Sequence, residues 1–376
     1  MTSRLHQTFL LPAALLTAFA APALAHHGIG RFDPRGEMTV EGTLTKVEFV
    51  NPHSYVYLEA VGADGEVVEM QCEMRAAVVL RRSGWSAEMF VPGAPVRIVG
   101  RPHRDDPRYC HVDTLTIGDA PTLERYEQLA DDDAIDRSNR PYRLASGEVN
   151  LSGEWAQEQY ILAQPPGGPA NLVPKSLIAA VEAGEVAMAD VPSHGWFPPP
   201  VTLTEAGRAA SAALRGLAPE DDPRLSCQIT SVLFDWVFDG TINRVTQQGD
   251  VITMEYGRGL ERTVHMNLAE HPAGVAPSRT GHSIGRWDGD TLVVDTVAFE
   301  PGRLAGAVAH SGELHLVERF TLDPESLELR REYVANDPLY FVDEYVSADT
   351  VLAADAPFAV DACKELAFEY QPAEGD

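Results

Sequence analysis

Hydrophobic and polar residues alternate with a period of two along much of the chain, which is the pattern of half-buried β-strands. The first such run is EMTVEGTLTKVEFV, residues 37–50, and the second is HSYVYLEAV, residues 53–61. The Asp64-Gly65 pair then predicts a hairpin turn into a third run, EVVEMQCEM, residues 66–74. The chain therefore begins its folded part with three consecutive strands.

A short helix and two more strands complete this first domain. Residues 75–83 are rich in Ala, Val and Arg and are followed by Gly84, as expected of a helix with a glycine stop. Two further strand patterns follow, at residues 95–101 and 109–117. Three strands, a helix and two strands are the order of an OB-fold, so we expect an OB-like five-stranded barrel over residues 26–120.

Residues 150–376 predict a second barrel, after a charged linker at 121–149. Short strand patterns alternate with turns such as Asp288-Gly289, and about eight strands in up-and-down order predict a lipocalin-like antiparallel barrel that holds one small ligand. An insertion at about 165–223 carries predicted helices at 172–183 and 204–217, with an N-cap at Thr204. We expect the insertion to cover a barrel mouth as a lid. The fold class is thus mainly β.

The first 25 residues have the pattern of a secretory signal peptide. A basic start with Arg4 precedes an apolar run at residues 9–20 and an A-x-A site at Ala23–Ala25. Cleavage after Ala25 leaves His26 as the mature N-terminus and places the protein in the periplasm or outside the cell. No second long apolar stretch follows, so we expect no membrane span after processing.

Composition and charge exclude several classes of partner. The chain has 376 residues and a formal net charge of -27, which disfavours nucleic acid and anionic membranes. An even number of cysteines agrees with export, and we favour disulfides within each domain, Cys72 with Cys110 and Cys227 with Cys363. No pattern in the sequence indicates an oligomeric state.

Histidines supply candidate metal ligands in the first domain. An α-amine beside an imidazole suits copper(II), so His26 could bind copper through its amine and ring together with His53. His27 could instead capture the ion with the amine and its own ring. The alternative interpretation is that His26 and His27 are solvated and that His53 only hydrogen-bonds its own turn.

The second domain has a candidate acid–base site. Several histidines lie near acidic residues along the chain. His282, next to Ser283 and Arg286, could form a polar corner at a barrel mouth, with His282 as a general base and Arg286 holding an anionic group of the substrate. The alternative is that Asp288 and Asp290 only supply turn chemistry. The histidines of this stretch are His265, His271, His282, His310 and His315.

Aromatic residues gather in the first half of the second domain and predict an apolar ligand site. The candidate ligand-binding residues are Trp155, Tyr160, Trp196 and Trp236. Core packing is the alternative use of these side chains.

Three parts of the chain carry resemblances to known families. The His-His start, the F-D-P triplet, GTLTKVEFVNPHSYVYLE and RRSGW resemble an exported bacterial family of unknown function. GHSIGRWDGDTLVVDTVAF, preceded by His271-Pro272, resembles the second half of longer exported proteins of this kind, and Gly153-Glu154-Trp155 resembles the G-x-W signature of lipocalins. The resemblances imply export and a two-part β architecture, but no reaction.

We therefore expect an exported binding protein for a small apolar or aromatic ligand, with a metal ion as an additional ligand. Two alternatives stay open. One is a lipocalin-like enzyme, an isomerase, lyase or hydrolase, that acts on a small hydrophobic substrate. The other is a copper protein that uses the mature N-terminal histidine.

Overall fold

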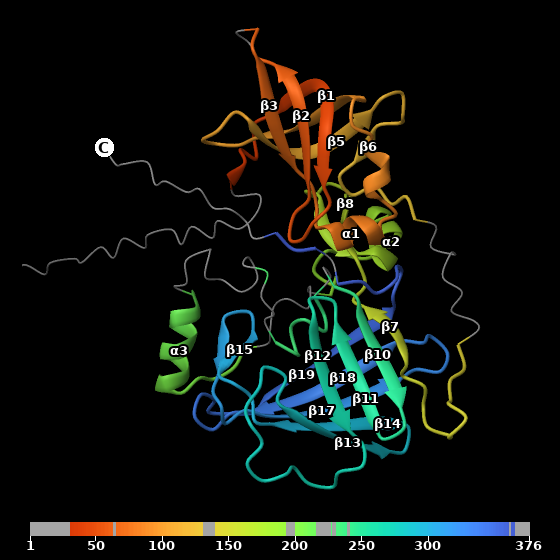
Figure 1. Ribbon diagram of the computed structural model, residues 1–376, viewed down its shortest axis with the longest axis vertical. Helices are drawn as coiled ribbons and strands as arrows, with labels where there is room; N and C mark the ends of the chain where they lie inside the picture. Colours follow the sequence, from red (N-terminus) through yellow and green to blue (C-terminus); the bar gives the residue numbers. More distant parts are fainter. Residues whose placement is uncertain are drawn as a thin grey trace, which may run out of the picture.

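The chain forms two β-barrels that lie at opposite ends of the long axis of the molecule (Figure 1). The N-terminal barrel precedes residue 131, and the C-terminal barrel is built between residues 153 and 353. This mainly β architecture confirms the predicted fold class. The computed structural model describes residues 31–62, 65–130, 140–192, 200–215, 227, 231–238, 241–360 and 362–364.

The N-terminal barrel has the strand order of an OB-fold, as predicted. β1 pairs with both β2 and β4, and β3 pairs in parallel with β5, which closes the barrel. The helix α1 lies between β3 and β4, and β6 extends the sheet beside β5. The elements are β1 Met38–Glu48, β2 Tyr55–Val61, β3 Val67–Glu73, α1 Ala77–Arg82, η2 Ala87–Met89, β4 Pro95–Pro102, β5 Tyr109–Ile117 and β6 Leu123–Glu124.

Alternating apolar side chains fill the N-terminal barrel, among them Leu44, Val56 and Ile98, which are fully buried. The predicted disulfide between Cys72 and Cys110 is formed within this core and joins β3 to β5. Gly84 ends the turn after α1 with φ +83, and a Cβ at this position would collide with the backbone of Ala130. Only glycine fits there without strain.

The C-terminal barrel has nine strands, and one neighbouring pair is parallel. The prediction of a closed barrel is confirmed. The prediction that all neighbouring strands are antiparallel was wrong for β12 and β13. β12 and β13 are joined by a long loop, residues 266–281, instead of a tight hairpin. The barrel strands are β7 Gly153–Ala156, β10 Asn243–Gln248, β11 Val251–Tyr256, β12 Leu260–His265, β13 His282–Asp288, β14 Thr291–Val297, β17 His315–Leu322, β18 Leu329–Asn336 and β19 Tyr345–Ala353.

The insertion between β7 and β10 is only partly helical. The predicted helix at 172–183 was wrong at its start, because β9 (Asn171–Pro174) pairs with β8 (Tyr160–Ala163). The 3-10 helix η4 (Lys175–Leu177) and the short α2 (Ile178–Glu182) follow β9.

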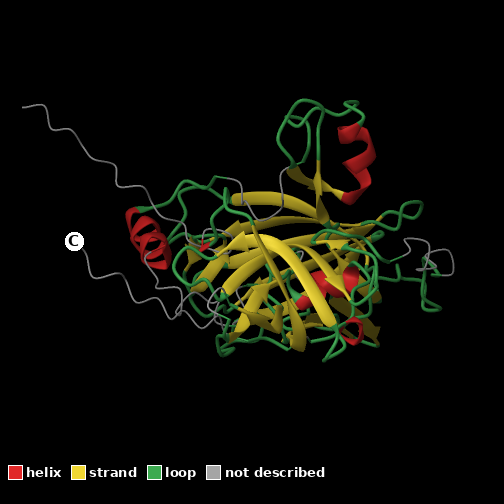
Figure 2. Ribbon diagram, turned by 90° about the horizontal axis from the view of Figure 1, so that it is seen from above, coloured by secondary structure: helices red, strands yellow, loops and turns green. Residues whose placement is uncertain are grey.

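The predicted helix at 204–217 is confirmed as α3 (Glu205–Arg215), which the Thr204 hydroxyl caps by accepting a hydrogen bond from the Gly207 N–H at 3.0 Å. α3 packs beside a small hairpin, β15 (Gly302–Ala305) and β16 (Val308–His310), and Ser211 Oγ accepts the Ala309 N–H at 3.1 Å. Figure 2 shows this helix at the edge of the molecule, apart from the barrel strands.

Residues 231–238, which we call the inner segment, fill the C-terminal barrel. Trp236 is 1% exposed, and its ring makes edge-on contacts with Tyr256 and Phe320 at centroid distances of 6.2 and 5.6 Å. Val232 and Leu233 belong to the same buried cluster. The chain itself therefore occupies the space in which we expected a small ligand.

Arg331 holds the inner segment in place and belongs to a group of paired charged side chains. Arg262 and Arg331 both pair with Glu318, at 2.5 and 3.2 Å, and Arg331 also pairs with Asp349 at 2.5 Å. Arg331 donates further hydrogen bonds to two backbone carbonyl groups of the inner segment. The charges are thus paired and hydrogen-bonded, as buried charges must be.

Several contacts join the N-terminal barrel to the second domain. Arg82 of α1 is buried and donates to Asp355 at 2.5 Å and to the carbonyl oxygen of Gln157 at 2.7 Å. The predicted disulfide between Cys227 and Cys363 is formed, and the backbone around Cys363 pairs with Asn51 of the N-terminal domain. Within the described part of the chain, no helix is long and apolar enough to cross a membrane.

Candidate functional site

The parallel pairing of β12 with β13 brings distant histidines together on the outside of the C-terminal barrel. His265 ends β12 and His282 begins β13, and the two imidazole rings stack at a centroid distance of 5.1 Å with an interplanar angle of 18°. The register of β13 with β14 then places Asp295 opposite Ile284, one outward position further along.

Strand alternation decides which side chains reach this face. Ser283 is 1% exposed and points inward, where its hydroxyl contacts Arg262 Nε at 2.9 Å. Its neighbours His282 and Ile284 therefore point outward. Arg286 is four residues after His282 on the same strand, so its side chain also points outward, and it is exposed. The two predicted catalytic residues thus share the outer face of β13 and do not face the barrel interior.

Four histidines and one aspartate form what we call the outer histidine cluster: His265, His271, His282, His315 and Asp295. His271 Nδ1 lies 2.8 Å from His282 Nδ1, and His271 Nε2 lies 3.1 Å from Asp295 Oδ1. His315 Nε2 lies 2.9 Å from the same carboxylate oxygen. A continuous chain of hydrogen bonds therefore joins His282 to Asp295 through His271.

The chain of contacts implies one arrangement of protons when the imidazoles are neutral. His271 donates from Nε2 to the Asp295 carboxylate, and its Nδ1 then accepts from His282 Nδ1. This leaves the lone pair of His282 on Nε2. The arrangement orients His282 as a base, in the same way that a carboxylate orients the histidine of a catalytic triad.

The surroundings of His282 favour its neutral form. Burial lowers the pKa of His282 below its ordinary value, and the positive charges that His271 and His265 carry when protonated lower it further. His282 is consequently able to accept a proton at neutral pH. The cluster is open to solvent, since the side chains of His315 and Asp295 are 46% and 39% exposed.

An apolar strip separates His282 from Arg286. The two residues are four apart on one strand, which corresponds to about 13 Å along it. Ile284 lies between them on β13. On the neighbouring strands, Asp295 and Val317 lie beside Ile284. Val293 lies beside Arg286. A molecule that contacts both His282 and Arg286 must therefore be elongated.

His310, another histidine of the candidate acid–base stretch, is not part of the cluster. It is buried at 6% exposure, with its Nδ1 3.0 Å from the carbonyl oxygen of Ser311 and its ring edge-on to Phe299.

The predicted ligand-binding aromatic residues do not form one group. Trp155 is fully buried, donates from Nε1 to the Leu151 carbonyl oxygen at 2.9 Å and carries the Arg140 guanidinium over its ring. Trp236 belongs to the inner segment, and Tyr160 lies on β8, outside the C-terminal barrel. Trp196 lies outside the described residues.

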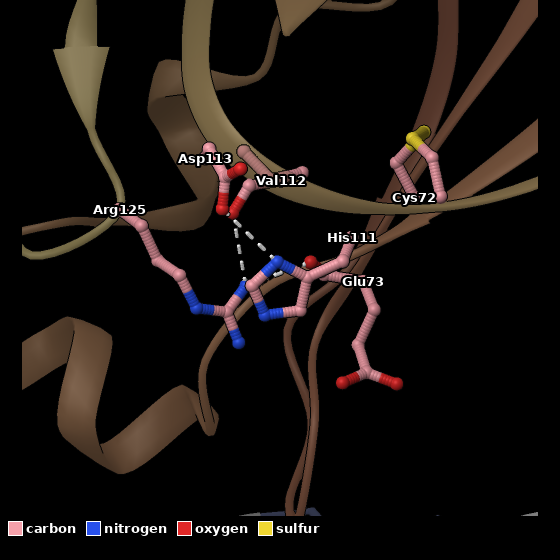
Figure 3. The surroundings of a disulfide bond; sticks show 7 residues. Cys72, Glu73, His111, Val112, Asp113 and Arg125 are labelled. Carbon is pink, nitrogen blue, oxygen red and sulfur yellow. Dashed lines mark hydrogen bonds and ion pairs between the residues drawn. A yellow bond between two sulfur atoms is a disulfide. The ribbon is translucent and has the colours of Figure 1, made fainter. Parts of the chain in front are cut away.

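Of the predicted metal ligands, His53 is described, whereas His26 and His27 lie outside the described residues. His53 Nδ1 lies 2.9 Å from Glu73 Oε1. Burial raises the pKa of Glu73, but the combined effect of His53, Arg125 and His111 holds this pKa below its ordinary value, and Figure 3 shows two of these residues, Arg125 and His111, next to Glu73. Among the described residues, no three histidine, cysteine, aspartate or glutamate side chains are grouped to hold a metal ion.

The sequence pattern indicated His282 as a base, but not which of the nearby residues join it. Strand alternation was a usable signal for His315 and Asp295, because both have the outward parity of their strands. The place of His271 had no such signal, since it lies in the loop between β12 and β13.

Comparison with known families supports the resemblance of the N-terminal part. Residues 14–110 match a family of unknown function (DUF6152). The match spans the N-terminal barrel as far as the start of β5, and it confirms that this part resembles a family without a known activity. No curated protein matches the chain.

Proposed function

We propose that this protein is an exported enzyme in which His282 acts as a general base on a small, elongated hydrophobic substrate with an anionic group. The observation that carries the proposal is the hydrogen-bond chain from Asp295 through His271 to His282. The signal-peptide pattern and the two disulfides support export.

The chain of contacts gives each residue a role. His282 accepts a proton from the substrate, or from a water molecule, at Nε2. His271 Nδ1 accepts a hydrogen bond from His282 Nδ1, and the Asp295 carboxylate keeps His271 in the tautomer that this bond requires. His315 donates to the same carboxylate and holds it in position.

The outer face between His282 and Arg286 favours a substrate with an apolar middle part and an anionic group at one end. Ile284 and Val317 are half-buried and offer apolar contact, and Arg286 can pair with a carboxylate or phosphate about 13 Å from the base. A binding protein for an apolar ligand inside the barrel has less support, because Trp155 and Trp236 are already packed by the chain itself.

Activated esters test the reactivity of His282 without knowledge of the natural substrate. We expect His282→Gln to lower the rate of p-nitrophenyl acetate hydrolysis by about 10- to 100-fold, within the range of general-base catalysis. His271→Gln and Asp295→Asn should lower it less, since they only orient the base. His103→Gln, a histidine of the other domain, is the matched control and should leave the rate unchanged.

Arg286 is tested by comparing p-nitrophenyl acetate with a p-nitrophenyl ester that ends in a carboxylate at the far end of its acyl chain. Arg286→Gln should raise KM for the charged ester alone, whereas Arg330→Gln on β18 should not. Equal hydrolysis by the parent protein and His282→Gln would contradict the catalytic role of His282.

The pH profile gives a second test. The neutral imidazole is the reactive form, so the rate should fall as the pH drops through the pKa of His282. Because that pKa lies below the ordinary histidine value of 6.5, the fall should occur at a lower pH than for free imidazole. Hydrolysis that falls already at a pH above 6.5 is inconsistent with His282 as the base.

A further inference from the structure

The outer face of the C-terminal barrel carries apolar side chains beyond the outer histidine cluster. Val317 lies opposite Asp295 in the register of β17 with β14. On the next two strands, Val334 lies opposite Val317, and Val346 lies opposite Val334 (Figure 1). Val317, Val334 and Val346 therefore form one row across β17, β18 and β19, which we call the valine row. It begins beside Asp295 of the cluster.

The valine row points toward solvent. Tyr333 and Tyr345, the residues before Val334 and Val346, are 8% and 2% exposed and belong to the barrel core. Strand alternation therefore turns the two valines outward. Val346 is 60% exposed, and Val317 and Val334 are half-buried. A ligand that covers the row removes this apolar surface from water, which favours binding.

Polar residues border the valine row on both sides. One neighbouring row holds His315, and the other holds Arg319 and Glu332, which lie opposite each other. Arg319 pairs with Asp288 at 2.8 Å, and Glu332 pairs with Arg330 at 3.0 Å. The apolar surface is thus one side chain wide, which fits a single extended hydrocarbon chain.

The loop between β18 and β19, residues 337–344, adds exposed apolar side chains at one end of these strands. Leu339 and Val342 are 51% and 61% exposed. The loop begins one residue beyond the position opposite His315, so it lies at the histidine end of the sheet. The buried Asp337 carboxylate accepts the Leu339 N–H at 3.2 Å, which fixes the start of the loop. Exposed apolar groups that gather in this way mark a binding surface.

The valine row and Arg286 lie in different directions from His282. Neighbouring strands are about 4.8 Å apart, so the four steps from β13 to β19 span about 19 Å across the sheet. Arg286 lies about 13 Å from His282 along β13 itself. A substrate that uses both surfaces has its reacting group near His282, an apolar chain that crosses the strands and an anionic group that follows β13.

We propose that the valine row binds an unbranched acyl chain, so that the substrate is an ester of a medium-chain fatty acid with an alcohol that carries the anionic group. This inference rests on the proposed function, because it requires His282 as the base. A protein partner is disfavoured, since a row one side chain wide falls short of the roughly 1,000 Å² that a specific protein interface buries. The exposed Asp343 and Glu344 disfavour an anionic lipid surface.

Hydrolysis of such an ester balances with water as the co-reactant. His282 Nε2 takes a proton from a water molecule while the water oxygen forms a bond to the acyl carbon. The ester C–O bond then breaks, and the alcohol oxygen leaves with the proton that His282 returns. The products are the free fatty acid and the anionic alcohol.

Preference for chain length tests the valine row. In the parent protein, we expect the ratio of kcat/KM for p-nitrophenyl octanoate to kcat/KM for p-nitrophenyl acetate to exceed the ratio for free imidazole by about tenfold or more. Val334→Thr and Val346→Thr keep the shape and the β-propensity of the side chain but add a hydroxyl group. Each should lower the ratio about three- to tenfold. Val61→Thr, at a valine of β2 that is 72% exposed, is the matched control and should keep the parent ratio.

A binding measurement separates this inference from the catalytic role of His282. Octanamide is neutral and is not an ester, so its binding to His282→Gln, followed by saturation-transfer NMR, reports on the valine row without the reaction. We expect Val346→Thr in this background to weaken binding by about threefold or more. If octanamide binding depends on Val346 but the parent protein and His282→Gln hydrolyse esters equally, the proposed function and the ester substrate are both overturned, and a binding surface remains.

Two outcomes overturn the inference while His282 keeps its role. The first is an octanoate-to-acetate ratio that neither valine variant changes, in a protein whose ester hydrolysis depends on His282. The acyl chain then does not lie on the valine row. The second is an altered oligomeric state of Val346→Thr in sedimentation with an unchanged ratio, which assigns the row to contact between copies of the chain.

Discussion

Arg331 lies fully buried inside the C-terminal barrel, where an isolated charge would be costly. It is tolerated because Asp349 and Glu318 balance its charge and because it also donates to backbone carbonyl groups of the inner segment. Burial raises the pKa of Asp349 above its ordinary value even beside Arg331. Arg331 is therefore the residue that balances the negative charges of Asp349 and Glu318 in the barrel interior.

Replacement of Arg331 by methionine should lower the free energy of unfolding by about 3 to 5 kcal/mol, because the change leaves buried carboxylates without a partner. Urea unfolding at neutral pH measures this effect. Arg330→Met, at the adjacent exposed position of β18, should change stability by less than about 1 kcal/mol. A similar loss in both variants would show that charge on β18, and not burial, is responsible.

At the residue scale, the sequence located the strand that carries His282 and Arg286 but not the direction of their side chains. Turn signals around Asp288-Gly289 placed the strand correctly, and alternation then required Ser283 and His282 to face opposite sides. The polar Ser283 faces the core because it contacts the buried Arg262, and this contact could not be foreseen from spacing along the chain.

At the element scale, the hairpins and the OB-like order were predictable because each follows from local turn and alternation signals. The parallel pair of β12 and β13 was not, since a long loop connects them and their contact depends on the closed barrel. The position of the inner segment inside the barrel was equally unpredictable from the sequence. Its apolar residues 232–238 indicate burial, but nothing local indicates that they enter a barrel.

The inner segment should act as a structural part of the C-terminal barrel. Trp236→Ala removes a large buried side chain and should lower the free energy of unfolding by about 3 to 5 kcal/mol. Leu339→Ala, at a residue that is 51% exposed, should have little effect.

The resulting cavity lies among Tyr256 and Phe320, so added indole should occupy it and raise the melting temperature of Trp236→Ala but not of the parent protein. If indole stabilised both proteins equally, a ligand cavity would already exist and the filled barrel would be contradicted.

At the scale of the whole molecule, the two barrels share a small apolar interface and the buried Arg82. Val78 and Val79 of α1 pack with Ala156, Ile242 and Ala354 of the second domain. Because of this contact, the two domains pack against each other although a charged linker was predicted between them at residues 121–149.

Arg82→Met should uncouple the domains. Loss of its charged hydrogen bonds to Asp355 and to the Gln157 carbonyl should cost about 2 kcal/mol. Calorimetry should then resolve two thermal transitions in place of a more cooperative one. Arg97→Met, at an exposed pair on β4, should keep the parent profile, and an unchanged profile for Arg82→Met would mean that the barrels unfold independently already.

The disulfide between Cys227 and Cys363 spans 136 residues and encloses every strand from β10 to β19. A single backbone cut anywhere inside that loop leaves two pieces that stay covalently joined. The backbone around Cys363 also pairs with Asn51, which attaches the C-terminal piece to the N-terminal domain. A protease that cuts the chain once between Cys227 and Cys363 would therefore release no fragment until the disulfide is reduced.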